Sequence, residues 1–409
     1  MKFPRLEDID VAGKTVLVRT DLNVPMQGGK VTSNNRIVRL LPTLNYLMKK
    51  KCRIVLLSHF DRPKGKFVPS MSLAPLVDAL SEAMNGKKIQ FGVDCIGPAA
   101  RDAIAKLKQG DIILLENLRF HPEEESGDEN FARELASLGE VFVNDAFSAS
   151  HRAHASITGL STYLPVAAGR LMQEELSSIY SIFSTAKKPI TAIVGGSKVS
   201  TKLELLENLV TRVDNLVIGG AMANTFLLAQ GHAVGKSLVE TNLKATAKRV
   251  LDLAKKKKCS VILPVDVIVG DPDLSARHNA CVGIEDIPPA QMILDIGNET
   301  LRAIAACLAQ SKTVIWNGPM GLFETRPYDV STLMIAREIA RLTADGSLKS
   351  IAGGGDTVAA LAIAGMGGSF SYLSTAGGAF LEYLEGKTLP GITMLMEAKN
   401  GSGKIKAHG

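Results

Sequence analysis

Gly353-Gly354-Gly355-Asp356-Thr357 lies between an apolar run at residues 348–352 and a helix-favouring run at residues 358–364. This order predicts a strand, a glycine turn and a helix. Glycines allow a polyphosphate to approach the backbone closely, and the N–H groups and dipole of a helix start favour negative charge. Asp356 could then hold a metal ion on that phosphate. The alternative is a tight strand-to-helix turn in which Asp356 is the N-cap.

The same order of strand, turn and helix recurs along most of the chain, which is typical of βαβ units. We therefore predict an α/β fold with two lobes. Each lobe is expected to be a doubly wound, mainly parallel sheet with helices on both faces. A length of 409 residues exceeds one comfortable core and indicates two domains of roughly 200 residues each.

Composition places the chain among ordinary globular proteins, with 46% hydrophobic and 22% charged residues. No apolar run is long enough to span a membrane, and the first residues lack the apolar core of a secretory signal. The 5 cysteines form no CxxC pair, which indicates reduced thiols. We therefore expect a cytoplasmic protein. A net charge of +6 allows anionic ligands without requiring nucleic acid.

Polar residues follow the first predicted strand, at residues 15–19. Asp21 and Asn23 occupy alternate positions there and point to one side if the chain stays extended. The loop beyond a parallel strand is where such sheets bind ligands, so this pair could hold a hydroxylated substrate. Turn chemistry ahead of Pro25 explains the same residues equally well.

Basic residues gather near the strands of the first lobe. They are Arg36 at the start of a helical stretch, His59 and Arg62 after residues 53–57, Arg119 after residues 111–115, and Arg152 after residues 140–143. Each arginine alone reads best as a solvated surface charge. Together they would line one rim of the sheet, where forked guanidinium groups suit phosphate and carboxylate oxygens. We expect a trap for a small, multiply anionic molecule.

A helix at residues 171–183 is expected to connect the lobes, and the second lobe then repeats the strand, glycine turn and helix. Gly195 and Gly196 follow its first strand. Lys198 and Lys202 are four residues apart and would share one helical face, as a phosphate clamp or as a plain surface pair. Gly219, Asn317 and the glycines before Asp356 also follow strands. Several glycine-rich turns at the ends of strands suggest a nucleotide site formed by backbone groups.

Two motifs of other nucleotide enzymes are missing. The run from Gly231 to Ser237 resembles a P-loop but has one residue too few between its glycines. There is no GxGxxG after the first strand. Both omissions count against P-loop kinases and nicotinamide-dependent dehydrogenases.

The chain resembles the phosphoglycerate kinase family, in its bacterial form, in a series of motifs that spans nearly its whole length. They are VRTDLNVP (18–25), NNRI (34–37), SHFDRPKG (58–65), ENLRFHPEEE (116–125), VNDAFSASHRAHAS (143–156), GGSKVSTK (195–202), WNGPMGLFE (316–324), GGGDT (353–357) and STAGGAFLEYLEGKTLPG (374–391). The resemblance implies a two-lobed kinase that passes phosphate reversibly between 1,3-bisphosphoglycerate and ADP, with Mg²⁺. It also implies a monomer without nucleic-acid or membrane partners.

The resemblance assigns roles to residues that match the family motifs. Asp21, Asn23, Arg36, His59, Arg62, Arg119 and Arg152 match the 3-phosphoglycerate site. Gly195, Lys198, Lys202, Gly219, Asn317, Glu324, Gly354, Gly355, Asp356 and Thr357 match the nucleotide site, with Glu324 at the ribose and Asp356 near the metal. Arg36, Lys198, Lys202 and the helix start at Gly355 would stabilise the transferring phosphate.

The implied domains are a substrate domain at residues 1–170, a hinge helix at 171–186 and a nucleotide domain at 187–390. Residues 391–409 are expected to return to the first domain. Asp61 and Ala376 depart from the family, which usually has glycine at both positions. The tail beyond Met396 also looks longer than the usual ending.

The implied mechanism needs no general base, because the attacking carboxylate is already ionised. Positioning and charge neutralisation would carry the reaction, with the lobes closing to exclude water. A two-lobed anion-binding protein without catalysis is the alternative.

Overall fold

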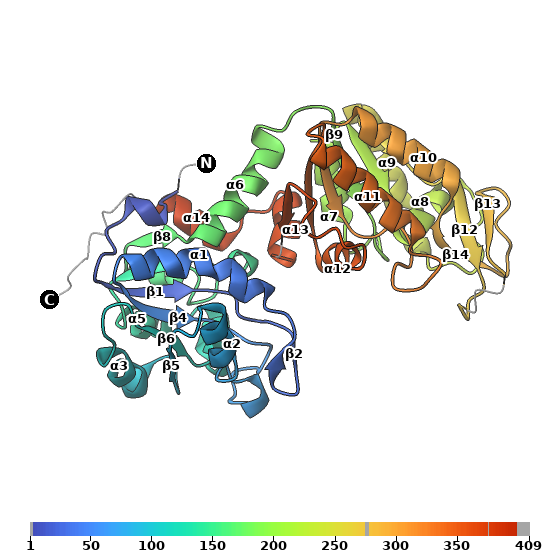
Figure 1. The fold of residues 1–409 in the computed structure, drawn as a ribbon. Helices are drawn as coiled ribbons and strands as arrows, with labels where there is room; N and C mark the ends of the chain where they lie inside the picture. The colour runs from blue at the N-terminus through green and yellow to red at the C-terminus, as the bar shows by residue number, and fades with distance from the viewer. Residues whose placement is uncertain (1–2, 275–277, 375, 399–409) are drawn as a thin grey trace. The chain divides into compact units, whose positions relative to one another are not determined.

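The computed structural model describes residues 3–274, 278–374 and 376–398. The chain divides into two compact units, Met1–Ser177 together with the segment from Thr388 onward, and Ser178–Lys387 (Figure 1). Thr375, which belongs to one family motif, and residues 399–409 of the tail lie outside the described residues.

The first unit is built on a parallel six-stranded sheet in the order β5-β6-β4-β1-β7-β8. Its strands are β1 Thr15–Arg19, β4 Arg53–Leu57, β5 Ile89–Gly92, β6 Ile112–Leu115, β7 Val141–Asn144 and β8 Val166–Ala168. A small antiparallel pair, β2 Met26–Gln27 and β3 Lys30–Val31, extends from the loop after β1. The strands predicted at residues 15–19, 53–57, 111–115 and 140–143 are confirmed as β1, β4, β6 and β7, with ends that agree to within one residue.

Helices cover both faces of this sheet. They are α1 Asn35–Lys49, α2 Leu76–Ala83, α3 Gly97–Ala105, α4 Pro122–Ser126, α5 Glu129–Ala136 and α14 Pro390–Glu397, with short 3₁₀ turns η1 Leu6–Asp8, η2 Pro69–Met71, η3 Leu118–Phe120, η4 Phe147–Ala149 and η5 Gly159–Thr162. Val16 and Val18 pack in the core beneath α1 and α2. Leu17, on the opposite face of β1, is equally buried. Burial of alternate residues on both faces explains why these strands are apolar throughout.

The second unit repeats this design in a parallel sheet with the order β11-β10-β9-β15-β16-β17. Its strands are β9 Ile190–Val194, β10 Asn215–Ile218, β11 Ser260–Ile262, β15 Thr313–Asn317, β16 Lys349–Gly353 and β17 Tyr372–Ser374. Its helices are α7 Leu203–Val210, α8 Met222–Gln230, α9 Lys244–Lys257 (after the 3₁₀ turn η6 Thr241–Leu243), α10 Asn298–Gln310, α11 Val330–Ala344, α12 Gly355–Ile363 and α13 Gly378–Leu384. The predicted α/β fold with parallel sheets and helices on both faces is confirmed.

The second unit also contains an antiparallel sheet that was not predicted from the sequence. Its strands are β12 Asp266–Gly270, β13 Ala280–Gly283 and β14 Met292–Ile296, in the order β13-β12-β14. Helix α6, Arg170–Ser184, runs from one unit into the other. Pro42 lies inside α1 without ending it.

In each parallel sheet, the first strand along the chain lies in the interior of the sheet, and later strands are added first on one side of it and then on the other. After β1 the chain adds β4 on one side and later β7 on the other. After β9 it adds β10 on one side and later β15 on the other. Ligands bind beyond the carboxyl ends of strands where the strand order reverses in this way. The fold therefore predicts ligand sites at the carboxyl ends of β1 and β9 and of the strands beside them. No helix in the described part of the chain is long and apolar enough to cross a membrane.

Candidate active site

The exit of β1 holds the carboxylate of Asp21 between basic and polar groups. Arg36 Nη1 donates a 2.6 Å hydrogen bond to Asp21 Oδ2, and the Ser148 hydroxyl donates to the same oxygen. Burial would raise the pKa of Asp21, but the Arg36 charge and these hydrogen bonds lower it below its ordinary value. Asn23 Oδ1 accepts from the backbone N–H of Asp61 at 3.1 Å. The structure thus brings Asp21 and Arg36 into contact.

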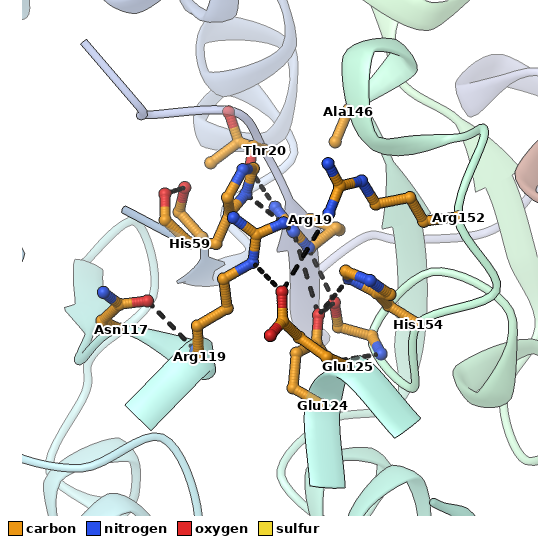
Figure 2. Close-up of polar contacts among 12 residues, drawn as sticks. Arg19, Thr20, His59, Asn117, Arg119, Glu124, Glu125, Ala146, Arg152 and His154 are labelled. Atoms are coloured by element: carbon orange, nitrogen blue, oxygen red, sulfur yellow. Dashed lines mark hydrogen bonds and ion pairs between the residues drawn. The ribbon is translucent and has the colours of Figure 1, made fainter. Parts of the chain in front are cut away.

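His59 follows β4 and is buried against Arg19, the last residue of β1 (Figure 2). Arg19 Nη2 lies 3.1 Å from His59 Nδ1. Because a guanidinium can only donate, Nδ1 must accept, and the ring proton is left on Nε2. Burial and the charge of Arg19 hold the pKa of His59 well below its ordinary value. His59 is therefore a neutral hydrogen-bond donor at physiological pH.

Two of the predicted arginines converge on one carboxylate, that of Glu125 in α4 (Figure 2). Arg119 Nε lies 3.2 Å from Glu125 Oε1, and Arg152 Nη1 lies 4.0 Å from the same oxygen. Arg119 Nη1 also donates to the backbone oxygen of Asp61 at 2.7 Å, and Arg119 is only 4% exposed. The buried guanidinium is thus held in place by the backbone as well as by Glu125.

Arg62 is exposed, and its side chain makes no hydrogen bond or ion pair with the described residues. Asp61, the first departure from the family, adopts a left-handed backbone with φ of +51°. Glycine favours that region, which explains why the family usually has glycine there, and aspartate is among the residues that tolerate it. The contacts of Asp61 with Asn23 and Arg119 come from its backbone, and aspartate retains them.

Arg19 and the two acidic residues Glu124 and Glu125 were not predicted as site residues from the sequence. Glu124 is fully buried, accepts hydrogen bonds from the hydroxyl and N–H of Ser156, and lies 4.0 Å from Arg19. His154 Nδ1 lies 3.7 Å from Glu124, so this histidine belongs to a buried polar network. The sequence marks Arg19 only as the last residue of an apolar strand, a position that does not by itself indicate a buried polar network.

In the second unit, Lys202 and Asn317 meet although 115 residues separate them. Lys202 Nζ donates to Asn317 Oδ1 at 2.7 Å, and Asn317 Nδ2 donates to the backbone oxygen of Gly353 at 2.7 Å. Burial lowers the pKa of Lys202 to about 8, and the Asp356 charge opposes this shift. The exits of β9, β15 and β16 are thereby tied together.

The expected placement of Lys198 and Lys202 on one helical face is wrong. Helix α7 begins only at Leu203, with Lys202 as its N-cap, and Lys198 lies in the preceding turn. Lys198 is exposed, whereas Lys202 turns inward to Gly195 and Asn317. Glycines at 195 and 196 allow this tight turn, and the chain has no helical periodicity until after it.

Most of the glycines at the carboxyl ends of these strands are packed closely against neighbouring backbone or side chains. A Cβ on Gly195 would lie 1.8 Å from the oxygen of Pro319, and one on Gly219 would lie 2.4 Å from Met320 Sδ. A Cβ on Gly353 would lie 2.5 Å from the ring of Phe380. Only at Gly355, within the GGG turn, would a Cβ meet nothing within 4 Å. Room for a ligand in that turn is therefore concentrated at Gly355.

Helix α12 starts at Gly355, with Gly354 as its N-cap at φ of +102°. Asp356 is consequently the second residue of the helix, and the alternative in which it is the N-cap is wrong. Thr357 Oγ1 accepts from the N–H of Gly318 at 2.7 Å, which ties the helix start to the exit of β15. Asp356 is left exposed in the first turn.

A pocket of about 460 Å³ opens beside these residues, within the second unit. Its lining includes Gly196, Gly220, Leu294, Phe323, Glu324 and Asp356. This volume suits a small organic ligand. Glu324 and Asp356 are exposed, so the pocket combines an apolar wall with two carboxylates.

The predicted metal residue, Asp356, offers hard carboxylate oxygens of the kind that Mg²⁺ prefers. Within the described residues, the one cluster of three side chains able to hold a metal is Asp94, Cys95 and His121, which lies in the first unit. Asp356 is outside it. Mg²⁺ usually binds one or two carboxylates plus substrate phosphates, and a single protein carboxylate fits that pattern.

Ala376, the second departure from the family, is buried. The next residue, Gly377, has a φ of +54°, a backbone conformation that favours glycine. The segment after Gly377 contributes α13 to the second unit, and α14 lies in the first, where Gly391 N donates to Ser150 O at 2.9 Å.

Fold and site together are those of a two-domain α/β phosphotransferase. The family model described as phosphoglycerate kinase matches residues 6–387. The chain belongs to the phosphoglycerate kinase family.

Individual relatives agree with this family. A phosphoglycerate kinase from Ruegeria sp. (strain TM1040) is 53% identical over 395 residues, which cover 97% of this chain and 100% of that protein. The solved structure of phosphoglycerate kinase from Coxiella burnetii has a TM-score of 0.89 at 40% identity, covering 97% of this chain and 100% of that one. The Pyrococcus horikoshii OT3 structure has a TM-score of 0.78 at 30% identity, covering 96% and 98%.

Proposed function

We infer that the chain catalyses the reversible transfer of the acyl phosphate of 1,3-bisphosphoglycerate to ADP, giving 3-phosphoglycerate and ATP. This is a step of glycolysis and gluconeogenesis. The observation that carries the proposal is membership of the phosphoglycerate kinase family across residues 6–387. A passive anion-binding protein is the weaker alternative, because the family match spans nearly the whole chain and the relatives it resembles are phosphoglycerate kinases.

We assign 3-phosphoglycerate, the phosphate acceptor when the reaction runs from ATP, to the carboxyl edge of the first sheet. Arg119, Arg152 and the more exposed Arg62 would bind its phosphate, since guanidinium forks suit phosphate oxygens. Asp21, as an acceptor, and the amide of Asn23 would hold its hydroxyl. His59, neutral with its proton on Nε2, would donate a hydrogen bond to it. Arg36 would face the carboxyl end, where transfer occurs.

We assign the nucleotide to the pocket of the second unit. Glu324 would accept from the ribose hydroxyls, and the turns at Gly195 and Gly219 would face the base and phosphates. Lys198, Lys202, Asn317, Gly354, Gly355 and Thr357 would surround the phosphates. Asp356 would hold Mg²⁺, which would supply positive charge to neutralise the nucleotide phosphates. The N–H groups at the start of α12 add a fixed positive end at Gly355.

No general base is needed for this reaction, because the attacking carboxylate of 3-phosphoglycerate is already ionised. The chain supplies alignment and positive charge, chiefly from Arg36, Lys198, Lys202 and the start of α12. The acceptor and nucleotide residues belong to different units, so we expect the two substrates together to favour closure of the units. Closure would exclude water and prevent hydrolysis of ATP.

The five cysteines are all free thiols, which supports a cytoplasmic location, and we propose a monomer. The test of function is a coupled assay for ADP formation from ATP, Mg²⁺ and 3-phosphoglycerate. ADP formation that needs all three is expected. If ATP is consumed equally without 3-phosphoglycerate, or not at all, the proposal is wrong. Small-angle scattering should show a smaller radius of gyration with both substrates than with either alone.

A further inference from the structure

The ion pairs of Glu125 with Arg119 and Arg152 place a carboxylate where the proposed function needs an anionic substrate (Figure 2). Burial and the nearby Arg152 charge lower the pKa of Arg119, which reflects the repulsion between the two guanidinium groups. In the free protein, Glu125 supplies the negative charge that offsets this repulsion. A bound phosphate would supply negative charge to the same two guanidinium groups.

The contact with Glu125 leaves hydrogen bonding incomplete. Arg119 Nε is buried and donates no hydrogen bond within the described residues, although Glu125 Oε1 is only 3.2 Å away. A donor that lacks a well-aligned acceptor is unfavourable when buried. A substrate oxygen could accept from Arg119 Nε with better geometry. Glu125 is thus an imperfect occupant of this position.

The helix that carries Glu125 is anchored by its neighbour, while the side chain of Glu125 is partly exposed. The preceding residue, Glu124, is fully buried and accepts from Ser156 Oγ at 2.6 Å, which anchors α4. The side chain of Glu125 is 39% exposed. Its carboxylate can therefore swing into solvent when another anion arrives, without disturbing the helix.

The arginines do not depend on Glu125 for their positions. Arg119 Nη1 is held by the backbone oxygen of Asp61 at 2.7 Å, and Arg152 Nε donates to His151 Nε2 at 3.1 Å. Loss of the Glu125 charge should therefore leave both guanidinium groups in place. The direction in which Glu125 changes substrate affinity follows from this. A carboxylate that held the arginines in position would strengthen binding of the anionic substrate. A carboxylate that only occupies them must weaken it.

We propose that Glu125 is a built-in competitor of the anionic substrate, a displaceable carboxylate that sets its affinity by occupying Arg119 and Arg152. This deepens the proposed function and rests on it, since it takes 3-phosphoglycerate as the ligand of these arginines. The competitor weakens binding of acceptor and product alike. It thereby favours their release after each turnover.

The test compares Glu125→Gln with Glu123→Gln, an exposed glutamate of the same helix that forms no ion pair with the described residues. Calorimetry measures the Kd of 3-phosphoglycerate, and steady-state kinetics measure KM and kcat. Glu125→Gln should lower both Kd and KM by about fivefold, the upper range for a partly exposed ion pair, without raising kcat. Glu123→Gln should change neither. Glu125→Asp, which keeps the charge on a shorter arm, should fall between.

The direction of change separates this role from a structural one, because loss of a structural contact would weaken binding. Unchanged or weaker binding in Glu125→Gln would overturn the inference. Arg152→Ala distinguishes that failure from failure of the proposed function. If Arg152→Ala weakens 3-phosphoglycerate binding while Glu125→Gln does not tighten it, only the competitor role is wrong. If Arg152→Ala has no effect either, the assignment of the acceptor site is wrong.

Discussion

Arg19 Nη2 lies 3.1 Å from His59 Nδ1, so a fully buried guanidinium determines which nitrogen of the histidine carries its proton. The same arginine donates through Nε to Ser156 Oγ at 2.8 Å, and Ser156 donates to the buried Glu124. One residue at the end of β1 therefore connects the candidate acceptor site to the anchor of α4.

Replacing Arg19 should destabilise the protein strongly. Arg19→Met removes the main compensating charge of the buried Glu124, and breaking one partner of a buried pair costs about 3–5 kcal/mol. The free energy of unfolding from denaturant titration measures this. The double variant Arg19→Met/Glu124→Gln should recover part of the loss, because no uncompensated carboxylate remains. A single-variant loss below about 1 kcal/mol would contradict the assigned network.

Arg36 should matter most in the transition state. By analogy with arginines that stabilise phosphoryl transfer, Arg36→Ala should lower kcat by roughly 10³ to 10⁵. Arg36→Lys should restore only part of this, because a point charge cannot reproduce the planar fork. Arg62→Ala, in an exposed substrate arginine, should act mainly through KM. Kinetics for both substrates and a thermal melt test this, and a kcat of Arg36→Ala within about threefold of wild type would remove Arg36 from the mechanism.

Asp356 should act through Mg²⁺. An acid in the first turn of α12 would repel nucleotide phosphates unless a cation lay between them. Asp356→Asn should therefore weaken binding of Mg²⁺–nucleotide but not of metal-free nucleotide, as calorimetry with and without Mg²⁺ would show. Glu299→Gln, which removes an acid from the first turn of α10, is the control. Equal Mg²⁺ dependence in Asp356→Asn and wild type would rule out a metal role.

The strands and the positions of the site loops could be predicted from local sequence patterns. The apolar runs that became β1, β4, β9 and β15 end in polar residues or glycine, so the strand exits could be located. Arg19 was missed because it reads as the last residue of an apolar strand, and its partner Ser156 lies 137 residues away. Long-range partners of this kind leave no local signal.

Acidic and glycine-rich runs were the harder cases. Glu124 and Glu125 lie in the run Glu123-Glu124-Glu125, which looks like a solvated surface, yet one is fully buried and the next faces two arginines. The glycines of the second unit suggested room for phosphate. Several of them instead allow neighbouring chain segments to pack closely, which periodicity and composition do not reveal.

Lys202 should make nucleotide binding depend on pH. Burial lowers the pKa of Lys202 to about 8, so the free protein loses this charge as the pH rises through that value. Nucleotide phosphates favour the charged lysine, so binding above pH 8 must take up a proton. Affinity should therefore fall above about pH 8, with a limiting slope of about tenfold per pH unit for one proton.

The lowered pKa of Lys202 should also make the free energy of unfolding depend on pH. An unfolded lysine holds its proton up to about pH 10.4, so between pH 8 and that value the unfolded state binds more protons than the folded one. The contribution of Lys202 to the free energy of unfolding should then rise with pH across this window, and Lys202→Met should abolish that rise.

For nucleotide binding, Lys202→Arg, which stays charged, should flatten the pH profile of the affinity above pH 8. Lys198→Arg should leave the slope of that profile unchanged. Identical pH profiles for wild type and Lys202→Arg, with no proton uptake in calorimetry across buffers, would show that Lys202 does not titrate at the nucleotide site.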